Sequence, residues 1–235
     1  MRQAQDSEII RLSMHIREGK PLSSFQCAGE QVKIITTRQV IPGMYTWADQ
    51  ILCATNEMRE DINKHVRNLK GYGVEPVKGD KIIGLQNQWD FVSEQNAPLT
   101  NGSIGYIKDY CKTSIPIPKY ISLQPINYMF TTMTTEDNGD IFKNIPIDYH
   151  FFRNGDPQLN PAEVAKLNKD NKFVYPAPYE FTYAYAITTW KAQGSEWDKV
   201  MGFEETFPRP KKEHVQFLYT MATRASKKLV LIMKP

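Results

Sequence analysis

The sequence predicts an α/β protein that carries a second, β-rich domain as an insertion. Strands and helices alternate up to residue 79 and again after residue 179. The stretch from residue 110 to 179 is instead rich in proline and in short runs of alternating polarity, which favour strands joined by turns. We therefore expect an α/β domain built from residues 1–105 and 180–235, with the inserted domain at residues 106–179.

Composition sets the broad class of the protein. The chain has 235 residues, of which 41% are hydrophobic and 23% charged, as in globular proteins of one large or two small domains. A formal net charge of +3 permits a polyanionic partner without requiring one. No apolar run is long enough for a membrane span and the N-terminus lacks a signal-like core, so we expect a soluble, cytoplasmic protein without a membrane partner. Three cysteines lie far apart without a C-x-x-C motif, and we expect neither a metal site nor a disulfide.

The first elements follow from helical and strand periodicity. Ser7 is expected to cap a helix whose apolar residues recur at helical spacing until Gly19. Residues 32–36 and 48–54 are typical of strands, the second one buried. A helix is expected to begin at Asn56, which is its predicted cap, and to place its apolar stripe in the core.

Short strands and turns dominate the middle of the chain. The strands expected there are residues 80–85, 103–108, 128–134 and 141–149. The turn Asn101-Gly102 introduces the second of them. One short helix is expected where Asn160 and Glu163 form a capping box. The α/β pattern then returns with strands at residues 181–187, 199–203 and 229–233 and a helix at residues 213–222.

The most informative stretch is residues 185–200, which read YAITTWKAQGSEWDKV. A strand ends there at hydroxyl residues, and a polar turn follows that offers backbone N–H groups and side-chain donors to a phosphate or a sugar. The stretch resembles motif V of superfamily 1 helicases of the RecD-like and phage type, whose usual form is T-x-H-K-x-Q-G-S-E. Trp190 stands where that form has histidine.

A second stretch, residues 218–232, reads LYTMATRASKKLVLI. It resembles motif VI of the same helicases, the Y-T-x-x-T-R-A signature. An arginine at the end of a helix can reach across a domain cleft, and its rigid fork suits a phosphoryl group that gathers charge in the transition state. The two motifs follow each other in the family's order, about 30 residues apart, and together they are highly specific.

Three weaker similarities extend the resemblance along the chain. Residues 1–20 are similar to the segment that opens the second motor domain of these helicases, with Arg2 at the place of the motif IV arginine. Residues 49–59, DQILCATNEMR, are similar to the next strand–helix unit, and residues 98–105, PLTNGSIG, to the stretch that leads into the small inserted domain called 2B. The chain as a whole therefore resembles the C-terminal half of a superfamily 1B DNA helicase.

This resemblance implies a fold and a division of labour. The implied fold is a RecA-like, P-loop-NTPase-type domain, 2A, which lacks the Walker A motif and carries an inserted SH3-like β-barrel, 2B. The sequence contains no G-x-x-x-x-G-K-[ST] and no Asp-Glu pair at a strand end. The resemblance places those elements in an N-terminal RecA-like domain, upstream of a residue equivalent to Met1. That domain would make most of the contacts to ATP and Mg²⁺. We therefore expect this chain alone to be inactive.

The resemblance also implies roles for individual residues, each with a plainer structural alternative. The implied catalytic residues are Arg224 and Arg2, and the implied nucleotide-binding residues are Gln193, Gly194 and Glu196. The implied contacts to single-stranded DNA are Thr188, Trp190, Asn56, Arg59 and Asn101. The plainer alternative for Arg224 is an arginine at a helix end that interacts favourably with the helix dipole. Gln193 and Glu196 could be ordinary polar turn residues, and Trp190 a tryptophan at the edge of the core. At the level of the whole chain, a non-catalytic DNA-binding or scaffold module and an inactive helicase fragment both stay open.

Overall fold

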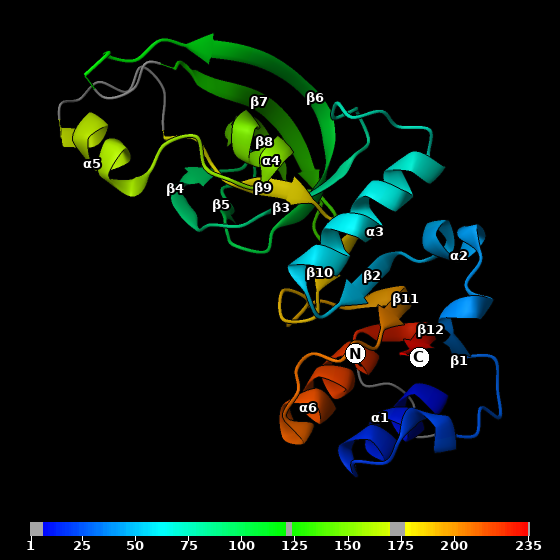
Figure 1. Ribbon diagram of the computed structural model, residues 1–235. Coiled ribbons are helices and arrows are strands. Elements are labelled where there is room, and N and C mark those ends of the chain that lie inside the picture. The colour runs from blue at the N-terminus through cyan, green and yellow to red at the C-terminus, as the bar shows by residue number, and fades with distance from the viewer. Residues whose placement is uncertain (1–6, 121–123, 170–176, 235) are drawn as a thin grey trace. The chain divides into compact units, whose positions relative to one another are not determined.

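The computed structural model describes residues 7–120, 124–169 and 177–234 (Figure 1). The chain divides into two compact units: a first unit of Met1–Gly73 and Tyr185–Pro235, and an inserted unit of Val74–Ala184. Each unit has its own sheet and its own core.

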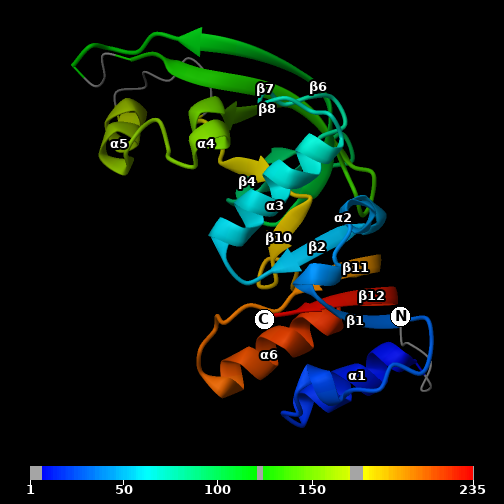
Figure 2. The ribbon, with the colours of Figure 1, turned by 45° about the vertical axis from the view of Figure 1, so that its right-hand side comes forward.

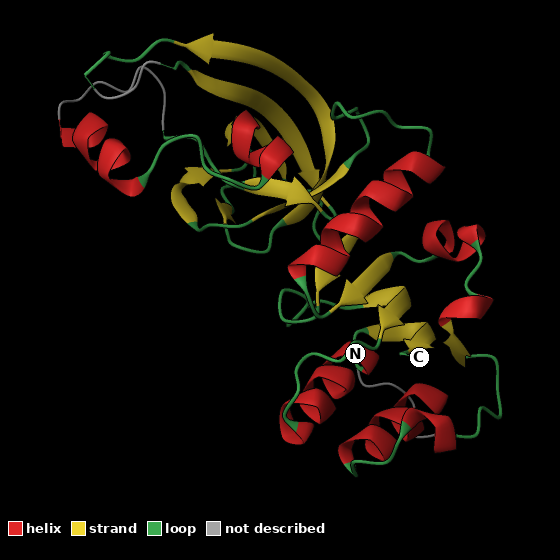
Figure 3. Ribbon diagram, viewed as in Figure 1, coloured by secondary structure: helices red, strands yellow, loops and turns green. Residues whose placement is uncertain are grey.

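A parallel five-stranded sheet forms the centre of the first unit (Figure 3). Its order is β1 (Val32–Thr36), β12 (Ala225–Met233), β11 (Trp197–Phe203), β2 (Gln50–Cys53) and β10 (Ala186–Thr188). All four strand pairings are parallel. The predicted α/β class is confirmed for this part of the chain.

Helices cover both faces of this sheet (Figure 2). Helices α2 (Pro42–Trp47) and α3 (Asn56–Leu69) lie on one face, and α1 (Glu8–Arg17) and α6 (Lys211–Ala222) pack together on the other. Two short 3₁₀ turns, Leu22–Ser24 and Thr37–Gln39, flank β1.

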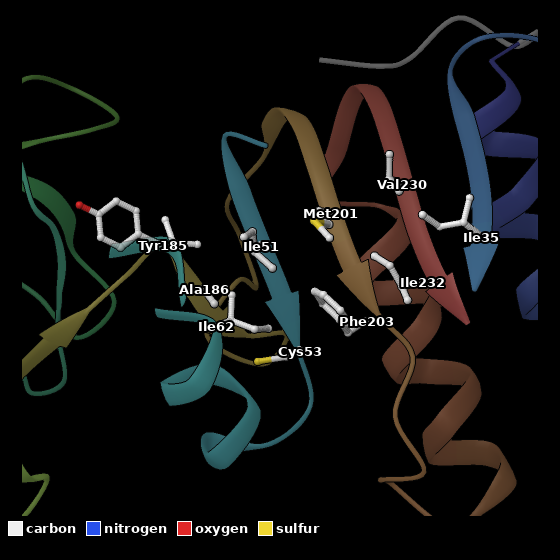
Figure 4. Packing of buried hydrophobic residues seen from close by; sticks show 11 residues of the cluster. Ile35, Ile51, Cys53, Ile62, Tyr185, Ala186, Met201, Phe203, Val230 and Ile232 are labelled. Atoms are coloured by element: carbon white, nitrogen blue, oxygen red, sulfur yellow. The ribbon is translucent and has the colours of Figure 1, made fainter. Parts of the chain in front are cut away.

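Because both faces are covered, the strands are apolar on both sides. Successive side chains of β2, β11 and β12 point to alternate faces of the sheet. Figure 4 shows the hydrophobic cluster on the face that α2 and α3 cover. Gly202 faces α6 so closely that an added Cβ would collide with the sulfur of Met221. The close approach of α6 to the sheet therefore depends on this glycine.

Helix α1 begins after Ser7 as expected, but the Ser7 side chain does not cap it. The side-chain oxygen of Gln31 accepts a hydrogen bond from the backbone N–H of Glu8 at 2.9 Å and performs that function. The Glu8 carboxylate in turn accepts from the backbone N–H groups of Ala28 and Val32, so α1 is tied to the loop before β1.

The inserted unit is built on an antiparallel five-stranded sheet. Its order is β8 (Ile141–Asp148), β7 (Ile126–Thr135), β6 (Ile104–Ile115), β3 (Lys81–Gly84) and β9 (Phe181–Tyr183). A small sheet of β4 (Gln88–Val92) and β5 (Pro98–Leu99) and helices α4 (Tyr149–Asn154) and α5 (Pro161–Lys169) complete the unit. At the start of α5, Asn160 and Glu163 form the predicted capping box.

The expected single strand at residues 181–187 is wrong. The chain bends at Ala184 and Tyr185, and the two halves of the run join different sheets: β9 pairs with β3, whereas β10 pairs with β2. Strand β3 lies before residue 106, where we expected the inserted domain to begin, yet it pairs with β6 in the inserted sheet. An apolar run has the same appearance in sequence whichever sheet it joins.

Candidate functional site

The loop at residues 189–196 runs from the carboxyl ends of the strands of the parallel sheet, here called its carboxyl edge, to their amino ends, here called its amino edge. Thr188 ends β10 and is in register with Cys53, the last residue of β2. Trp197 begins β11 and is in register with Ala225, the first residue of β12. Because the strands are parallel, Thr188 lies at the carboxyl edge of the sheet and Glu196 at the amino edge. The candidate residues therefore form two groups at opposite edges.

Arg224 lies at the amino edge, between α6 and β12. Its Nη1 donates to the backbone oxygens of Ser195 at 3.0 Å and Ala192 at 3.4 Å. Its Nε donates to the backbone oxygen of Thr220 at 3.1 Å, and its Nη2 to the hydroxyl of Thr223 at 3.1 Å. The guanidinium thus connects the end of α6 to the turn before β11.

That turn carries the three residues expected to bind nucleotide. Gln193 and Glu196 are exposed, and Gly194 has a φ of 91°, a backbone conformation that glycine adopts without strain. The backbone N–H of Ser195 closes the turn onto the oxygen of Ala192 at 3.1 Å. The exposed side chains of Gln193 and Glu196 therefore directly follow, in the chain, the two residues whose backbone oxygens accept hydrogen bonds from Arg224.

Trp190 lies on the same loop, against α6. Its ring stacks on Phe217 with centroids 5.6 Å apart and lies 6.1 Å from the ring of Phe207. Trp190 is nevertheless 46% exposed and Phe207 49% exposed. A pocket of about 610 Å³ lies between the loop and α6, lined by Thr189, Trp190 and Gln193 on the loop side. Both the core-edge and the stacking interpretations of Trp190 are thus compatible with its surroundings.

At the carboxyl edge, β10 is fixed by its neighbours. Thr189 donates from its backbone N–H and from its hydroxyl to the backbone oxygen of Cys53, at 2.9 and 3.2 Å. Asn63 of α3, only 3% exposed, bonds both the N–H and the oxygen of Ala186 through its side-chain amide. The position of Thr188 is therefore set by β2 and α3 together.

The cap of α3 differs from the sequence-based expectation. Thr55, not Asn56, accepts the capping hydrogen bond, from the backbone N–H of Met58 at 3.3 Å, and Asn56 is exposed. The carboxylate of Glu205 accepts from the Thr55 hydroxyl at 2.7 Å and from the backbone N–H groups of Ala54 and Thr55. Sequence reasoning missed Glu205, because it lies 150 residues from Thr55 and no local pattern marks it.

Two cations lie close together at this edge. The Arg59 side chain is 17% exposed and pairs with Glu60 at 3.1 Å, while its Nε is buried without a hydrogen-bond partner among the described residues. Burial lowers the pKa of Lys191, and the positive charge of Arg59 lowers it further. Lys191 is a second residue that we had not singled out, although it occupies the lysine position of the motif V pattern.

Two expected site residues are not part of these two groups in the first unit. Asn101 belongs to the inserted unit, where it is exposed on the turn before β6 and donates from its backbone N–H to the side-chain oxygen of Asn87 at 2.8 Å. Arg2 lies outside the residues that the structure describes. Within the described ranges, no group of three or more His, Cys, Asp and Glu side chains could hold a metal ion.

Both motif-like stretches lie within a segment that is similar to one known protein family. Residues 183–232 match the model of the UvrD-like helicase C-terminal domain. This segment is similar to UvrD-like helicase C-terminal domains. The match confirms the resemblance inferred from the motifs. The UvrD-like segment contains β10, the crossing loop, β11, α6 and most of β12, and with them Thr188, Gln193 and Arg224.

The fold of the chain is similar to that of a solved helicase structure. The Pif1 helicase from Candida albicans matches 99% of this chain and 54% of its own, with a TM-score of 0.50 and 14% identity. The Pif1 helicase from Bacteroides in complex with ADP-AlF3 and ssDNA matches 98% of this chain and 50% of its own, with a TM-score of 0.48 and 14% identity. The chain thus spans about half the length of these helicases and shares the fold of that half with the Candida albicans protein.

No curated protein sequence matches the chain significantly. None of the helices in the described part of the chain is long and apolar enough to cross a membrane.

Proposed function

We propose that this chain is the C-terminal motor half of an ATP-dependent DNA helicase of superfamily 1B. In this proposal it works with an N-terminal RecA-like domain, supplied in cis or in trans, and moves along single-stranded DNA. The observation that carries the proposal is the hydrogen bonding of Arg224 to the turn that bears Gln193, Gly194 and Glu196, all within the UvrD-like segment. These hydrogen bonds would keep the guanidinium of Arg224 at a fixed position relative to the turn that we propose binds the nucleotide.

The residues at the amino edge fit one wall of an ATP cleft. Of the five N–H donors of the Arg224 guanidinium, four are engaged, and the second N–H of Nη2 has no partner among the described residues. We assign that donor to the transferred phosphoryl group and assign Arg2 a supporting contact. Gln193, Gly194 and Glu196 would contact the nucleotide, while Mg²⁺ and the phosphates would be held mainly by the N-terminal domain.

We assign the carboxyl edge to single-stranded DNA. Thr188 and Asn56 offer uncharged polar groups there, and Arg59 would exchange its ion pair with the exposed Glu60 for one with a DNA phosphate. Trp190 would stack on a base with the part of its ring that Phe217 leaves uncovered. Asn101 would add a contact from the inserted unit. Opening and closing of the ATP cleft would then shift the grip on DNA at Thr188.

For the inserted unit we propose an SH3-like barrel, the 2B domain. Strands β8 and β9 are the two ends of the antiparallel sheet order. A bridge between Ile147 of β8 and Tyr179, two residues before β9, brings these two ends together. A sheet whose ends meet in this way curls toward a barrel.

A non-catalytic DNA-binding or scaffold module is the second candidate, and one observation favours it. Four of the five Arg224 donors already bond groups of this chain, which is also what a purely structural arginine does. The absence of a phosphate-binding loop from the sequence fits a chain that hydrolyses no ATP. An inactive helicase fragment would have the same two properties.

ATP hydrolysis by the chain, alone and fused to an N-terminal RecA-like domain of this superfamily, tests the proposal. We expect none from the chain alone and DNA-stimulated hydrolysis from the fusion. The chain alone should bind single-stranded DNA weakly, with log affinity falling by about 0.7 per log unit of salt for each phosphate contacted. DNA binding without hydrolysis by the fusion would favour the module. Hydrolysis by the chain alone, abolished by a substitution within it, would contradict the half-motor proposal.

A further inference from the structure

A hollow of about 840 Å³ lies on the outer layer of the first unit, between the end of α1 and the beginning of α6. Arg17, Glu18 and Gly19 line it from one side, and Lys211, Lys212 and Val215 are among the residues of α6 that line it from the other. The Cε atom of Lys211 lies 3.9 Å from the position that a Cβ on Gly19 would occupy, so the end of α1 and the beginning of α6 are close together. None of these residues belongs to the sites assigned above.

The rim of the hollow is positively charged. Arg17, Lys211 and Lys212 are exposed, and none of them forms an ion pair within the part of the chain that the structure describes. The carboxylate of Glu18 is already paired with Lys20 at 2.5 Å. Three uncompensated cations therefore converge on one concave surface and attract an anionic partner.

The floor of the hollow has a different character. Val215 and Tyr219 of α6 are half-buried and supply apolar surface beneath the basic rim. The hollow thus combines cations at its rim with an apolar centre, which is the usual anatomy of a peptide-binding surface.

We propose that this hollow binds an acidic peptide segment of a partner protein. At least two carboxylates of the peptide pair with Arg17 and the two lysines, and one apolar side chain covers Val215 and Tyr219. A nucleic-acid backbone fits less well, because it satisfies the cations but leaves the apolar floor uncovered. This inference does not rest on the proposed helicase function, since it uses neither the nucleotide turn nor the carboxyl edge.

Fluorescence anisotropy tests the proposal with a labelled synthetic peptide of four aspartates followed by leucine and phenylalanine. Matched peptides carry asparagine in place of the aspartates, or serine in place of the two apolar residues. We expect the complete peptide to bind and each matched peptide to bind at least tenfold more weakly. The double variant Lys211→Glu, Lys212→Glu should weaken binding of the complete peptide at least tenfold, and Arg17→Glu, on the other helix, should weaken it independently.

The control is the double variant Lys33→Glu, Lys64→Glu. It makes the same change in charge at exposed lysines of β1 and α3, which do not line the hollow, and should alter affinity less than twofold. Equal losses in the two double variants, or equal binding of the three peptides, would contradict the proposal. If the variants in the hollow instead weakened only binding of a single-stranded or duplex oligonucleotide, the hollow would be a nucleic-acid site and the proposal would be wrong. Circular dichroism establishes that each variant is folded.

Discussion

The guanidinium of Arg224 donates to the backbone oxygen of Ser195 at 3.0 Å, so the end of α6 and the turn before β11 are joined by a side chain. A substitution of this arginine therefore acts in two places. It removes the donor proposed for the phosphoryl group, and it releases the turn that bears Gln193 and Glu196. The two effects can be separated, because the first needs a complete ATP cleft and the second does not.

In a fusion with an N-terminal RecA-like domain, we expect Arg224→Lys to lower ATP turnover by about 10³-fold or more, because lysine keeps the charge but loses the planar fork. DNA affinity should change far less. Single-turnover hydrolysis and DNA anisotropy measure the two effects, with Arg38→Lys at an exposed position as the matched control. Collapse of DNA binding with near-normal hydrolysis would identify Arg224 as a DNA-binding or structural residue instead.

Trp190→Ala tests whether the exposed tryptophan is a stacking surface. Loss of its contact with Phe217 should destabilise the isolated chain, which a urea titration measures. Loss of a stacked base should in addition weaken binding of single-stranded DNA by about 1–3 kcal/mol. Trp190→Phe retains a ring and should recover part of both. A variant that loses stability but binds DNA normally would show that Trp190 is only a core-edge residue.

The sequence predicted the elements whose signals are local. Helices α1, α3 and α6 have apolar residues at helical spacing, and the turn at Gly194 and the helix-end Arg224 lie within two short motifs. These features depend on residues that are close to one another in the sequence. The periodicity of apolar residues and the spacing of motif residues are therefore sufficient to find them.

Features that depend on distant partners were not predictable in this way. The split between β9 and β10 arises because each half of one apolar run pairs with a different strand. The cap at Thr55 depends on Glu205, and the proximity of Arg59 to Lys191 depends on the packing of α3 beside β10. Hydrogen bonds and charge pairs of this kind exist only in the folded protein.

Glu205 offers a prediction about stability. Its carboxylate accepts from the hydroxyl and the backbone N–H of Thr55, and Glu205→Ala leaves these donors unpaired at the start of α3. We expect a loss of about 1–3 kcal/mol in the free energy of unfolding, and a smaller loss for Glu205→Gln, which keeps one acceptor oxygen. Urea unfolding measures both, and faster hydrogen exchange in the first turn of α3 locates the effect. Asp61→Asn, at an exposed position of the same helix, is the control. Unchanged exchange in that turn would contradict the anchoring role.

Glu75, near the start of the inserted unit, gives a prediction about pH. Its carboxylate accepts from Lys112 at 2.7 Å and from Tyr149 and Arg153 at 2.5 Å. The hydrogen bond from Lys112, followed by that from Tyr149, lowers the pKa of Glu75 from its ordinary value of 4.5 to about 2. A carboxyl group whose pKa is lower in the folded protein stabilises that protein fully above pH 4.5 and loses this contribution as the pH falls toward 2.

The free energy of unfolding of wild type and of Glu75→Gln should therefore differ most near neutral pH and converge in acid. Because the Glu75 side chain is 52% exposed, the difference should be small and should shrink further in high salt. An NMR titration of the Glu75 carboxyl measures the cause directly: its midpoint should rise toward 4.5 in Lys112→Met, which removes the first donor, and stay low in the control Lys108→Met. A stability difference that grows as the pH falls would have the opposite sign, and would mean that the protonated form of Glu75 is the one the fold favours.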